Sequence, residues 1–110
     1  MEKQIISQNK IVSELDGILS QLNKSQREKI ISGYDIKSLD KIFRDGETMR
    51  TVDAFLANGM NVSKTARILY MHRNTLIYKL NAIKRDTGLD LHDFRNAVTF
   101  TILRALYEMQ

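Results

Sequence analysis

The sequence predicts an all-α fold, and three observations support this. The chain has no proline and only five glycines in 110 residues, so few residues would interrupt a helix. Val, Ile and Thr are scattered and do not form the alternating runs that are typical of strands. Apolar residues instead recur three and four positions apart, which places them on one face of a helix.

A first helix is predicted over about residues 3–22. Two sets of residues with a spacing of seven form its apolar stripe: Ile5, Val12 and Leu19, and Gln8, Leu15 and Leu22. Three further residues widen this stripe: Ile6, Ile11 and Ile18. The stripe either packs on a core or forms a short coiled-coil or dimer seam. Fewer than three heptads are present, so the pattern leaves both interpretations open.

Two short helices are predicted next. Ser25 and Glu28 fit a capping box for the first of them, which would end before Gly33. Asp35 can cap the second, and Gly46 would end it. The second helix has one apolar face, formed by Ile36, Leu39, Ile42 and Phe43. We expect residues 1–46 to form an N-terminal helical extension that serves in dimerisation or as a linker.

Residues 47–110 are predicted to form a second unit that begins with a helix over 47–58, ended by Gly59. The apolar face of this helix is formed by Met49, Val52, Phe55 and Leu56. A shorter helix over 64–69 follows, with Ser63 as its N-terminal cap. Its small residues allow a neighbouring helix to approach closely.

A third helix of this unit is predicted to open at His72 and to end at Gly88. Its inward face is formed by Leu76, Ile77, Leu80 and Ile83. The connection between the second and third helices is about three residues, as a helix-turn-helix requires. The sequence therefore predicts a tri-helical helix-turn-helix with an additional C-terminal helix and an N-terminal helical extension.

The additional helix is predicted over residues 93–109 and is apolar around most of its circumference. Its apolar residues are Phe94, Ala97, Val98, Phe100, Ile102, Leu103, Leu106 and Tyr107. Such a helix must be buried on more than one side, either inside a domain or between subunits.

Polar and basic side chains gather at the start of the third helix. Arg73 and Asn74 are the best candidates for reading bases, because Arg pairs bidentately with guanine and Asn with adenine. Residues at the start of the supporting helix are expected near a phosphate. The full set of predicted DNA-binding residues is Ser63, Lys64, Thr65, His72, Arg73, Asn74, Thr75, Tyr78 and Lys79. Lys84 and Arg85 are expected to serve phosphates or a solvated face.

The segment TVDAFLANGMNVSKTARILYMHRNTLIYKLNAIKRDTGLDL resembles the C-terminal helix-turn-helix of the PucR/CdaR family of transcriptional regulators. The HRNTLxY run and the TGLD ending carry the resemblance, which covers roughly residues 47–106. A more distant similarity is to the Fis-type helix-turn-helix. The resemblance implies a DNA-binding transcriptional regulator whose recognition helix includes residues 73–79 and which binds a two-fold site as a homodimer. It also implies a sensor region, which residues 1–46 do not resemble.

Composition limits the remaining functions. The net charge of +4 has its excess in the C-terminal half, which suits a nucleic-acid partner. Cysteine is absent, which excludes disulfides and thiolate metal sites. No apolar run approaches the roughly 18 residues of a membrane span. We therefore expect a cytoplasmic, nucleoid-associated protein that binds double-stranded DNA, with an effector that the sequence does not indicate.

An enzyme is not expected, because no nucleophile–base pair or phosphate-binding glycine loop is evident. His92 lies beside Asp90 and Asp93, but this pattern is typical of a loop and a helix cap. We expect no metal and no cofactor. The alternative function is a helical protein–protein interaction or adaptor module, which the apolar last helix and the N-terminal stripe would suit.

Overall fold

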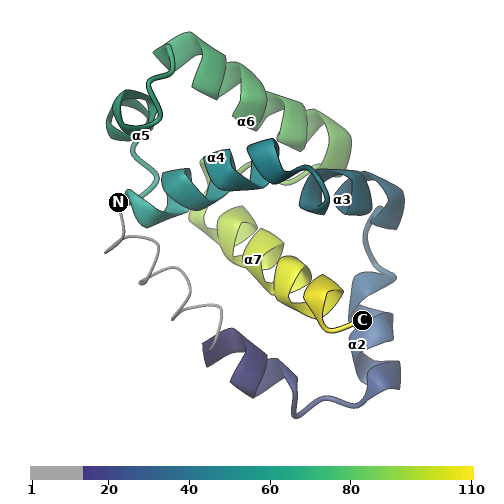
Figure 1. The fold of residues 1–110 in the computed structure, drawn as a ribbon. Coiled ribbons are helices and arrows are strands. Elements are labelled where there is room, and N and C mark those ends of the chain that lie inside the picture. The colour runs from purple at the N-terminus through teal and green to yellow at the C-terminus, as the bar shows by residue number, and fades with distance from the viewer. Residues whose placement is uncertain (1–13) are drawn as a thin grey trace.

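The structure, a computed structural model, describes residues 14–110 (Figure 1). Residues 14–19 are helical, and no strand occurs within the described part of the chain. The helices with complete bounds are α2 (Lys24–Ile31), α3 (Ile36–Phe43), α4 (Gly46–Ala57), α5 (Val62–Ile68), α6 (Arg73–Thr87) and α7 (Phe94–Glu108). The predicted all-α fold is confirmed. The beginning of the predicted first helix lies outside the described residues.

The first two of these helices start at side chains that accept backbone N–H groups. Asn23 caps α2: its Oδ1 accepts the Gln26 N–H at 2.8 Å, and Gln26 Oε1 accepts the Asn23 N–H at 2.9 Å. The capping box predicted at Ser25 is therefore wrong, since the helix begins two residues earlier. Asp35 caps α3 as predicted, through the Ser38 N–H at 3.2 Å.

The helices of the second half also have polar caps. Asp45 caps α4, so Gly46 is the first residue of that helix and does not end the preceding one. Asn61 caps α5 through the Lys64 N–H at 2.9 Å, and the cap predicted at Ser63 is wrong. Asp93 caps α7 through two backbone N–H groups.

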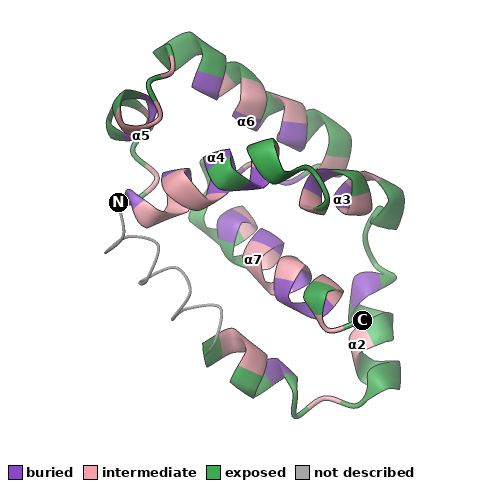
Figure 2. Cartoon of the chain, viewed as in Figure 1, coloured by how far each residue is buried: buried purple, intermediate pink, exposed green. Residues whose placement is uncertain are grey.

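The main hydrophobic cluster lies between α3, α4, α5, α6 and α7 (Figures 1 and 2). Phe55, Leu76 and Leu91 are completely buried in it. The other buried members are Leu39, Ile42, Met49, Val52, Ala66, Leu80, Ile83, Leu89, Phe100 and Leu103. Two of the buried members, Leu39 and Ile42, come from α3, which lies before the boundary predicted at residue 47. Burial of this size is the dominant stabilising contribution in a small domain.

A second cluster joins the end of α7 to α2 and to the N-terminal helical turn, residues 14–19 (Figure 1). Its buried members are Leu19, Ile31, Ala105 and Leu106, and Leu15, Leu22, Ile102 and Met109 pack against them. The described part of the predicted stripe therefore packs inward on α7. Ile18, which was predicted to widen that stripe, is 65% exposed and does not join the cluster.

α7 links the two clusters but is not buried all around. Phe94 and Val98 on its first half remain 71% and 41% exposed, so the expected burial on several sides is incomplete there. On its second half, Arg104 pairs with Asp53 of α4, and the Tyr107 hydroxyl donates to Asp40 of α3. This hydrogen bond raises the pKa of Tyr107, because it stabilises the protonated phenol.

Residues 14–110 contain neither a candidate membrane span nor a candidate metal site. None of the helices in this region is both long and apolar enough to span a membrane. Within the same region, no group of three or more His, Cys, Asp or Glu side chains is arranged to hold a metal ion.

Candidate nucleic-acid interface

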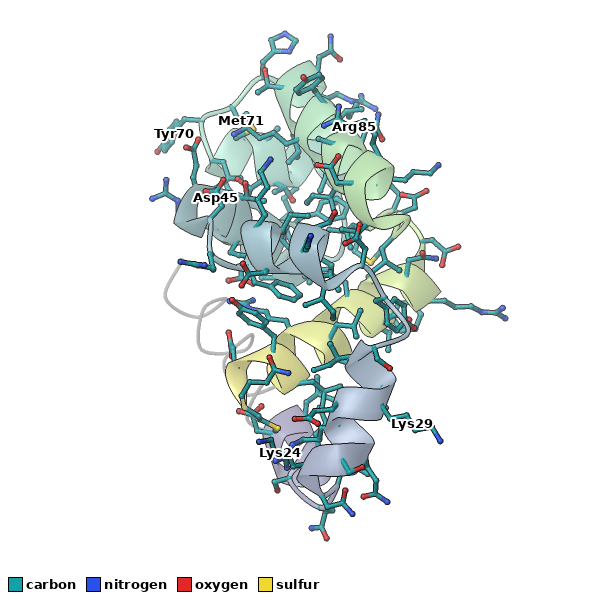
Figure 3. All side chains as sticks on the ribbon, turned by 90° about the vertical axis from the view of Figure 1, so that its right-hand side faces the viewer. Lys24, Lys29, Asp45, Tyr70, Met71 and Arg85 are labelled. Carbon is teal, nitrogen blue, oxygen red and sulfur yellow. The ribbon has the colours of Figure 1, made fainter. Side chains whose placement is uncertain are left out.

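The turn between α5 and α6 is compact because its backbone reverses at a left-handed residue. Met71 N–H donates to the Ala66 carbonyl at 2.9 Å and Tyr70 N–H to the Arg67 carbonyl at 3.2 Å, the paired bonds of a Schellman motif. Tyr70 has φ of 53°, in the left-handed region that favours glycine. Its side chain is 97% exposed, whereas Met71 packs against the main cluster (Figure 3).

His72 caps α6 as predicted, and α6 has the bounds that the sequence predicted. The Nδ1 atom of His72 accepts the backbone N–H of Asn74 at 3.2 Å. In this geometry the neutral ring carries its proton on Nε2. Because His72 is exposed, this Nε2–H is a donor at the tip of the helix. A phosphate oxygen is a suitable acceptor for such a group.

α6 has an inner face and an outer face. Leu76, Leu80 and Ile83 are buried, and the residues on the opposite side are exposed. The outer side carries a row at spacings of four, three and four, which we name the outer ridge: Asn74, Tyr78, Asn81 and Arg85. Tyr78 is 69% exposed within it. The outer ridge is a continuous polar surface that extends over about 16 Å of the helix.

Asn81 was not among the predicted DNA-binding residues, and Arg85 was expected to serve a phosphate or a solvated face. Asn81 lies seven residues after Asn74 and three after Tyr78. This helical spacing alone places the three residues on one face of the helix. Arg73 and Thr75, at the start of α6, flank the outer ridge and are exposed as expected.

The predicted residues on α5 divide into two groups. Ser63 and Lys64 are exposed on its first turn. Thr65 is completely buried, and its hydroxyl donates to the Asn61 carbonyl at 2.7 Å. Its side chain therefore stabilises the start of α5 and does not contribute to the surface. Arg67, which sequence analysis left out, is exposed on the same helix.

Lys79 lies on the flank of α6 that faces α4. Its Nζ is 3.2 Å from Glu47 Oε1, and its side chain is 31% exposed. Asp45 lines the same shallow crevice between α4 and α6. The backbone N–H and hydroxyl of Thr48 lower the pKa of Asp45, and the charge of Lys79 adds to this effect. The ammonium group is thus held by Glu47 of α4.

The cations of this region differ in how they are paired. Arg85 lies 3.1 Å from Asp86, whose carboxylate raises the pKa of Arg85, and Lys84 lies 3.8 Å from Asp90. Lys64, Arg67 and Arg73 form no ion pair with any residue in 14–110. The unpaired positive charge therefore gathers on α5 and at the tip of α6, where anionic ligands would meet it without displacing a partner.

The region that contains α5 and α6 matches a known protein family. The model of the PucR C-terminal helix-turn-helix domain matches residues 48–104, which is just over half of the chain. The match contains α5, α6 and the turn between them.

Individual relatives agree with this match. The chain is 34% identical over 73 residues to the carbohydrate diacid regulator of Escherichia coli, covering 66% of this chain and 18% of that protein. It is 35% identical over 54 residues to the purine catabolism regulatory protein of Bacillus subtilis, covering 49% of this chain and 10% of that protein. This chain thus corresponds to less than a fifth of either relative's length.

A solved structure is similar as well. It is the crystal structure of the regulator of polyketide synthase expression from Bifidobacterium adolescentis, with a TM-score of 0.59 and 31% identity. The similarity covers 76% of this chain and 32% of that one. The shared region therefore extends beyond the residues that the family model matches.

Proposed function

We propose that this chain, which belongs to the PucR C-terminal helix-turn-helix family, is a sequence-specific regulator of transcription that binds double-stranded DNA as a homodimer. In this proposal α6 enters the major groove, whose width of about 12 Å admits one helix. The protein would act in the cytoplasm, in association with the nucleoid.

The outer ridge is the observation that carries the proposal. α6 presents amide, phenol and guanidinium groups along the side opposite its buried leucines. These groups hydrogen-bond to base edges and phosphates, and the scaffold of α4 and α5 holds them in place. The two amides of the outer ridge, those of Asn74 and Asn81, can each pair bidentately with an adenine.

Each residue near the outer ridge has a proposed role. Arg73 and Asn74, at the tip of α6, read base edges, and Asn81 extends that contact along the groove. The proposed phosphate and sugar contacts come from Ser63, Lys64, His72, Thr75, Tyr78 and Lys79. Thr65 supports the site only through its hydrogen bond to Asn61.

Dimerisation is proposed because one recognition helix contacts too few base pairs to select a genomic site. In a two-fold dimer the two α6 helices would enter successive major grooves about 34 Å apart. Light scattering of the full chain across a concentration series tests this. A monomer at the concentration where specific DNA is bound, with one chain per site, would contradict the dimer but not DNA binding itself.

Fluorescence anisotropy with a selected DNA site tests the DNA-binding proposal. Sites can be enriched from random duplexes and then titrated over a range of salt concentrations. We expect tight binding at low salt and a steep linear loss of log affinity with log salt, because phosphate contacts release counterions. An absence of enriched sites together with an absence of low-salt binding would contradict the proposal.

Alanine variants distinguish the proposed base contacts from the proposed phosphate contacts. Asn74→Ala and Arg73→Ala should lower discrimination between the selected site and a scrambled duplex by about 1–3 kcal/mol for each lost bidentate contact. Lys79→Ala should weaken both duplexes similarly and reduce the salt slope by about 1. Lys29→Ala on α2, which is exposed and far from α6, is the matched control. Equal losses on both duplexes for all three test variants would contradict the assignment of base contacts.

A further inference from the structure

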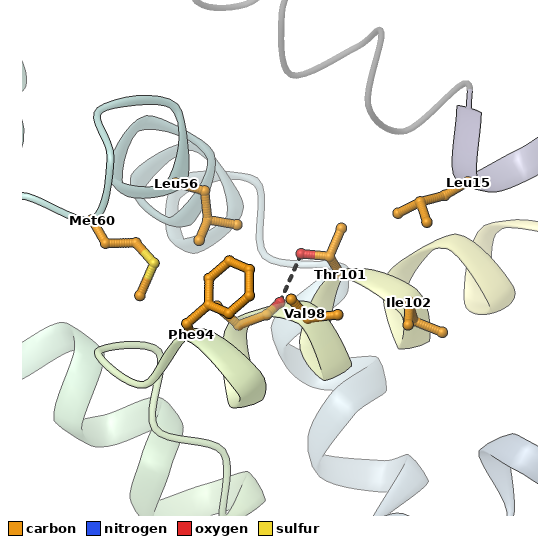
Figure 4. A pocket seen from close by; sticks show the side chains of 8 residues that line it. Leu15, Leu56, Met60, Phe94, Val98, Thr101 and Ile102 are labelled. Carbon is orange, nitrogen blue, oxygen red and sulfur yellow. Dashed lines mark hydrogen bonds between the residues drawn. The ribbon is translucent and has the colours of Figure 1, made fainter.

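In the described part of the chain, three aromatic side chains are strongly exposed, and their surroundings differ. Phe94 lies in an apolar groove between the end of α4 and α7, beside Leu56 and Met60 (Figure 4). Tyr78 belongs to the outer ridge of α6. Tyr70 is the most exposed of the three, at 97%, and projects from the turn between α5 and α6 (Figure 3). Packing within the chain therefore does not account for a tyrosine at this position.

The backbone of Tyr70 is strained as well. Its φ of 53° lies in the left-handed region, which tyrosine adopts at a steric cost that glycine does not bear. The turn imposes this conformation, because Tyr70 N–H donates to the Arg67 carbonyl and Met71 N–H to the Ala66 carbonyl. Non-glycine residues in this region cluster at functional sites. Tyr70 neither packs on the core nor relieves the strain, so a contact outside the chain would account for it.

The surroundings of Tyr70 are cationic. Residues 54–85 contain six Lys and Arg residues and no Asp or Glu. Arg67 is a direct neighbour, since the Tyr70 N–H donates to its carbonyl at 3.2 Å. Lys64 lies three residues before Arg67 on the exposed side of α5. Neither cation forms an ion pair with any residue in 14–110. The surface around Tyr70 therefore suits an anionic ligand.

The turn also lies where a helix-turn-helix meets the DNA backbone. In this motif the first helix crosses the backbone, while the N-terminal residues of the second helix contact base edges. Tyr70 follows the end of α5 and lies two residues before His72, the cap of α6. It is thus placed between the helix that crosses the backbone and the helix that enters the groove. A phenol hydroxyl at this point can donate a hydrogen bond to a phosphate oxygen.

We propose that Tyr70 is a further DNA contact, whose hydroxyl donates to a phosphate oxygen of the strand beside the tip of α6, while Arg67 neutralises charge on that strand. The inference rests on the proposed function, because it requires α6 to enter the major groove. It adds a contact from the turn itself, at a residue whose conformation is unfavourable for folding. Folding stability and DNA affinity therefore have opposite requirements at residue 70.

Two substitutions separate the hydroxyl from the charge. Tyr70→Phe keeps the ring and the backbone strain, and we expect affinity for the selected and the scrambled duplex to fall about three- to ten-fold. The slope of log affinity against log salt should stay the same, because a neutral hydroxyl releases no counterion. Arg67→Ala should weaken both duplexes and reduce that slope by about 1. Tyr34→Phe, at an exposed tyrosine between α2 and α3, is the matched control and should change neither quantity.

Tyr70→Gly removes the contact and the strain together. We expect a higher free energy of unfolding in urea, together with a DNA affinity no higher than that of Tyr70→Phe. A tyrosine with a purely structural role would not lower the DNA affinity of a variant that is more stable.

Duplexes with a neutral methylphosphonate at single positions of the selected site identify the phosphate. Neutralising the contacted phosphate should weaken binding of the parent chain. Tyr70→Phe should then add little to that loss, since both changes remove the same hydrogen bond. Full additivity at every phosphate near the tip of α6 would contradict the contact.

The outcomes distinguish this inference from the proposed function. An unchanged affinity of Tyr70→Phe for both duplexes would overturn the inference and leave DNA binding by α6 standing. A loss confined to the selected duplex would assign the hydroxyl to a base edge and would overturn the phosphate contact. A parent chain that binds neither duplex would overturn the proposed function, and this inference with it.

Discussion

At the scale of single residues, the turn between α5 and α6 contains an energetic penalty. Tyr70 adopts φ of 53°, while Gly88, at the end of α6, adopts φ of 79°. A non-glycine residue in the left-handed region costs about 1–2 kcal/mol, and the side chain of Tyr70 is too exposed to regain this through packing. Substitutions at these two positions are therefore expected to change the free energy of unfolding in opposite directions.

Tyr70→Gly should raise the free energy of unfolding by about 1 kcal/mol, since glycine adopts this conformation without steric strain. Gly88→Ala should lower it by a similar amount, because it introduces the strain that Tyr70→Gly removes. Urea unfolding followed by circular dichroism measures both. A destabilised Tyr70→Gly variant would show that the tyrosine side chain stabilises the fold in a way that its exposure does not suggest.

Glu47 restrains a cation of the proposed DNA interface. Glu47→Gln removes the carboxylate 3.2 Å from Lys79, so a phosphate can take the ammonium without displacing an anion. We expect DNA affinity at low salt to rise about two- to three-fold for specific and scrambled duplexes alike. Glu28→Gln removes a comparable exposed partner, that of Lys24 on α2, and should change nothing. A loss of affinity in Glu47→Gln would indicate that the ion pair positions Lys79 for binding.

At the scale of helices, three aspartates at helix starts make the free energy of unfolding depend on pH in the acidic range. Hydrogen bonds from the residues that follow lower the pKa values of Asp35, Asp45 and Asp93 below the ordinary value of 3.8. The stabilisation is present above that value and is lost as the pH falls through the lowered pKa values. Replacing all three by Asn keeps a cap but removes the titration, so stability should fall less between about pH 4 and pH 2. Thermal unfolding across this range measures the difference, and parallel curves would contradict it.

Two of the predicted helix starts, at Ser25 and Ser63, differ from the observed ones. Asn23-Lys24-Ser25 and Asn61-Val62-Ser63 each offer two good caps two residues apart, and in both the asparagine is used. An earlier start brings Val62 into contact with the main cluster, a gain that local preference does not reveal. His72, Asp35 and Gly88 were predicted correctly as caps, although Asn74, two residues after His72, is also a good capping residue.

The candidate site was predictable where helical spacing decides exposure. The tip of α6, with Arg73 and Asn74, is exposed as the sequence indicated. Thr65 was not predictable, because its burial depends on how α5 packs against α4 and α6. The attachment of Lys79 to Glu47 likewise joins residues 32 positions apart, a contact that no local pattern contains.

At the scale of the whole molecule, α7 belongs to both hydrophobic clusters and makes them one structure. Arg104 and Tyr107 reinforce it through Asp53 of α4 and Asp40 of α3. Asp53 holds the pKa of Arg104 above its ordinary value, although partial burial of the guanidinium opposes this. Unfolding should therefore be cooperative across the described chain.

Leu106→Ala tests this cooperativity, because Leu106 is completely buried in the second cluster. We expect a loss of about 2–5 kcal/mol in the free energy of global unfolding. Leu80 of α6 lies in the other cluster, and the free energy of opening measured by hydrogen exchange at its amide should fall by the same amount. Unchanged protection at Leu80 would show that the N-terminal part unfolds separately.

The end of α4 has a consequence for chemical ageing. Asn58 precedes Gly59, the sequence in which an asparagine side chain cyclises onto the next backbone nitrogen and deamidates most readily. In the folded chain Asn58 is 5% exposed and its amide donates to the Ala54 carbonyl at 2.7 Å, while Gly59 N–H donates to the Leu56 carbonyl at 3.2 Å. Both reacting groups are engaged, so folding protects the amide. Deamidation at Asn58 would then record the time that each molecule has spent unfolded, and repeated heating would convert reversible unfolding into permanent damage.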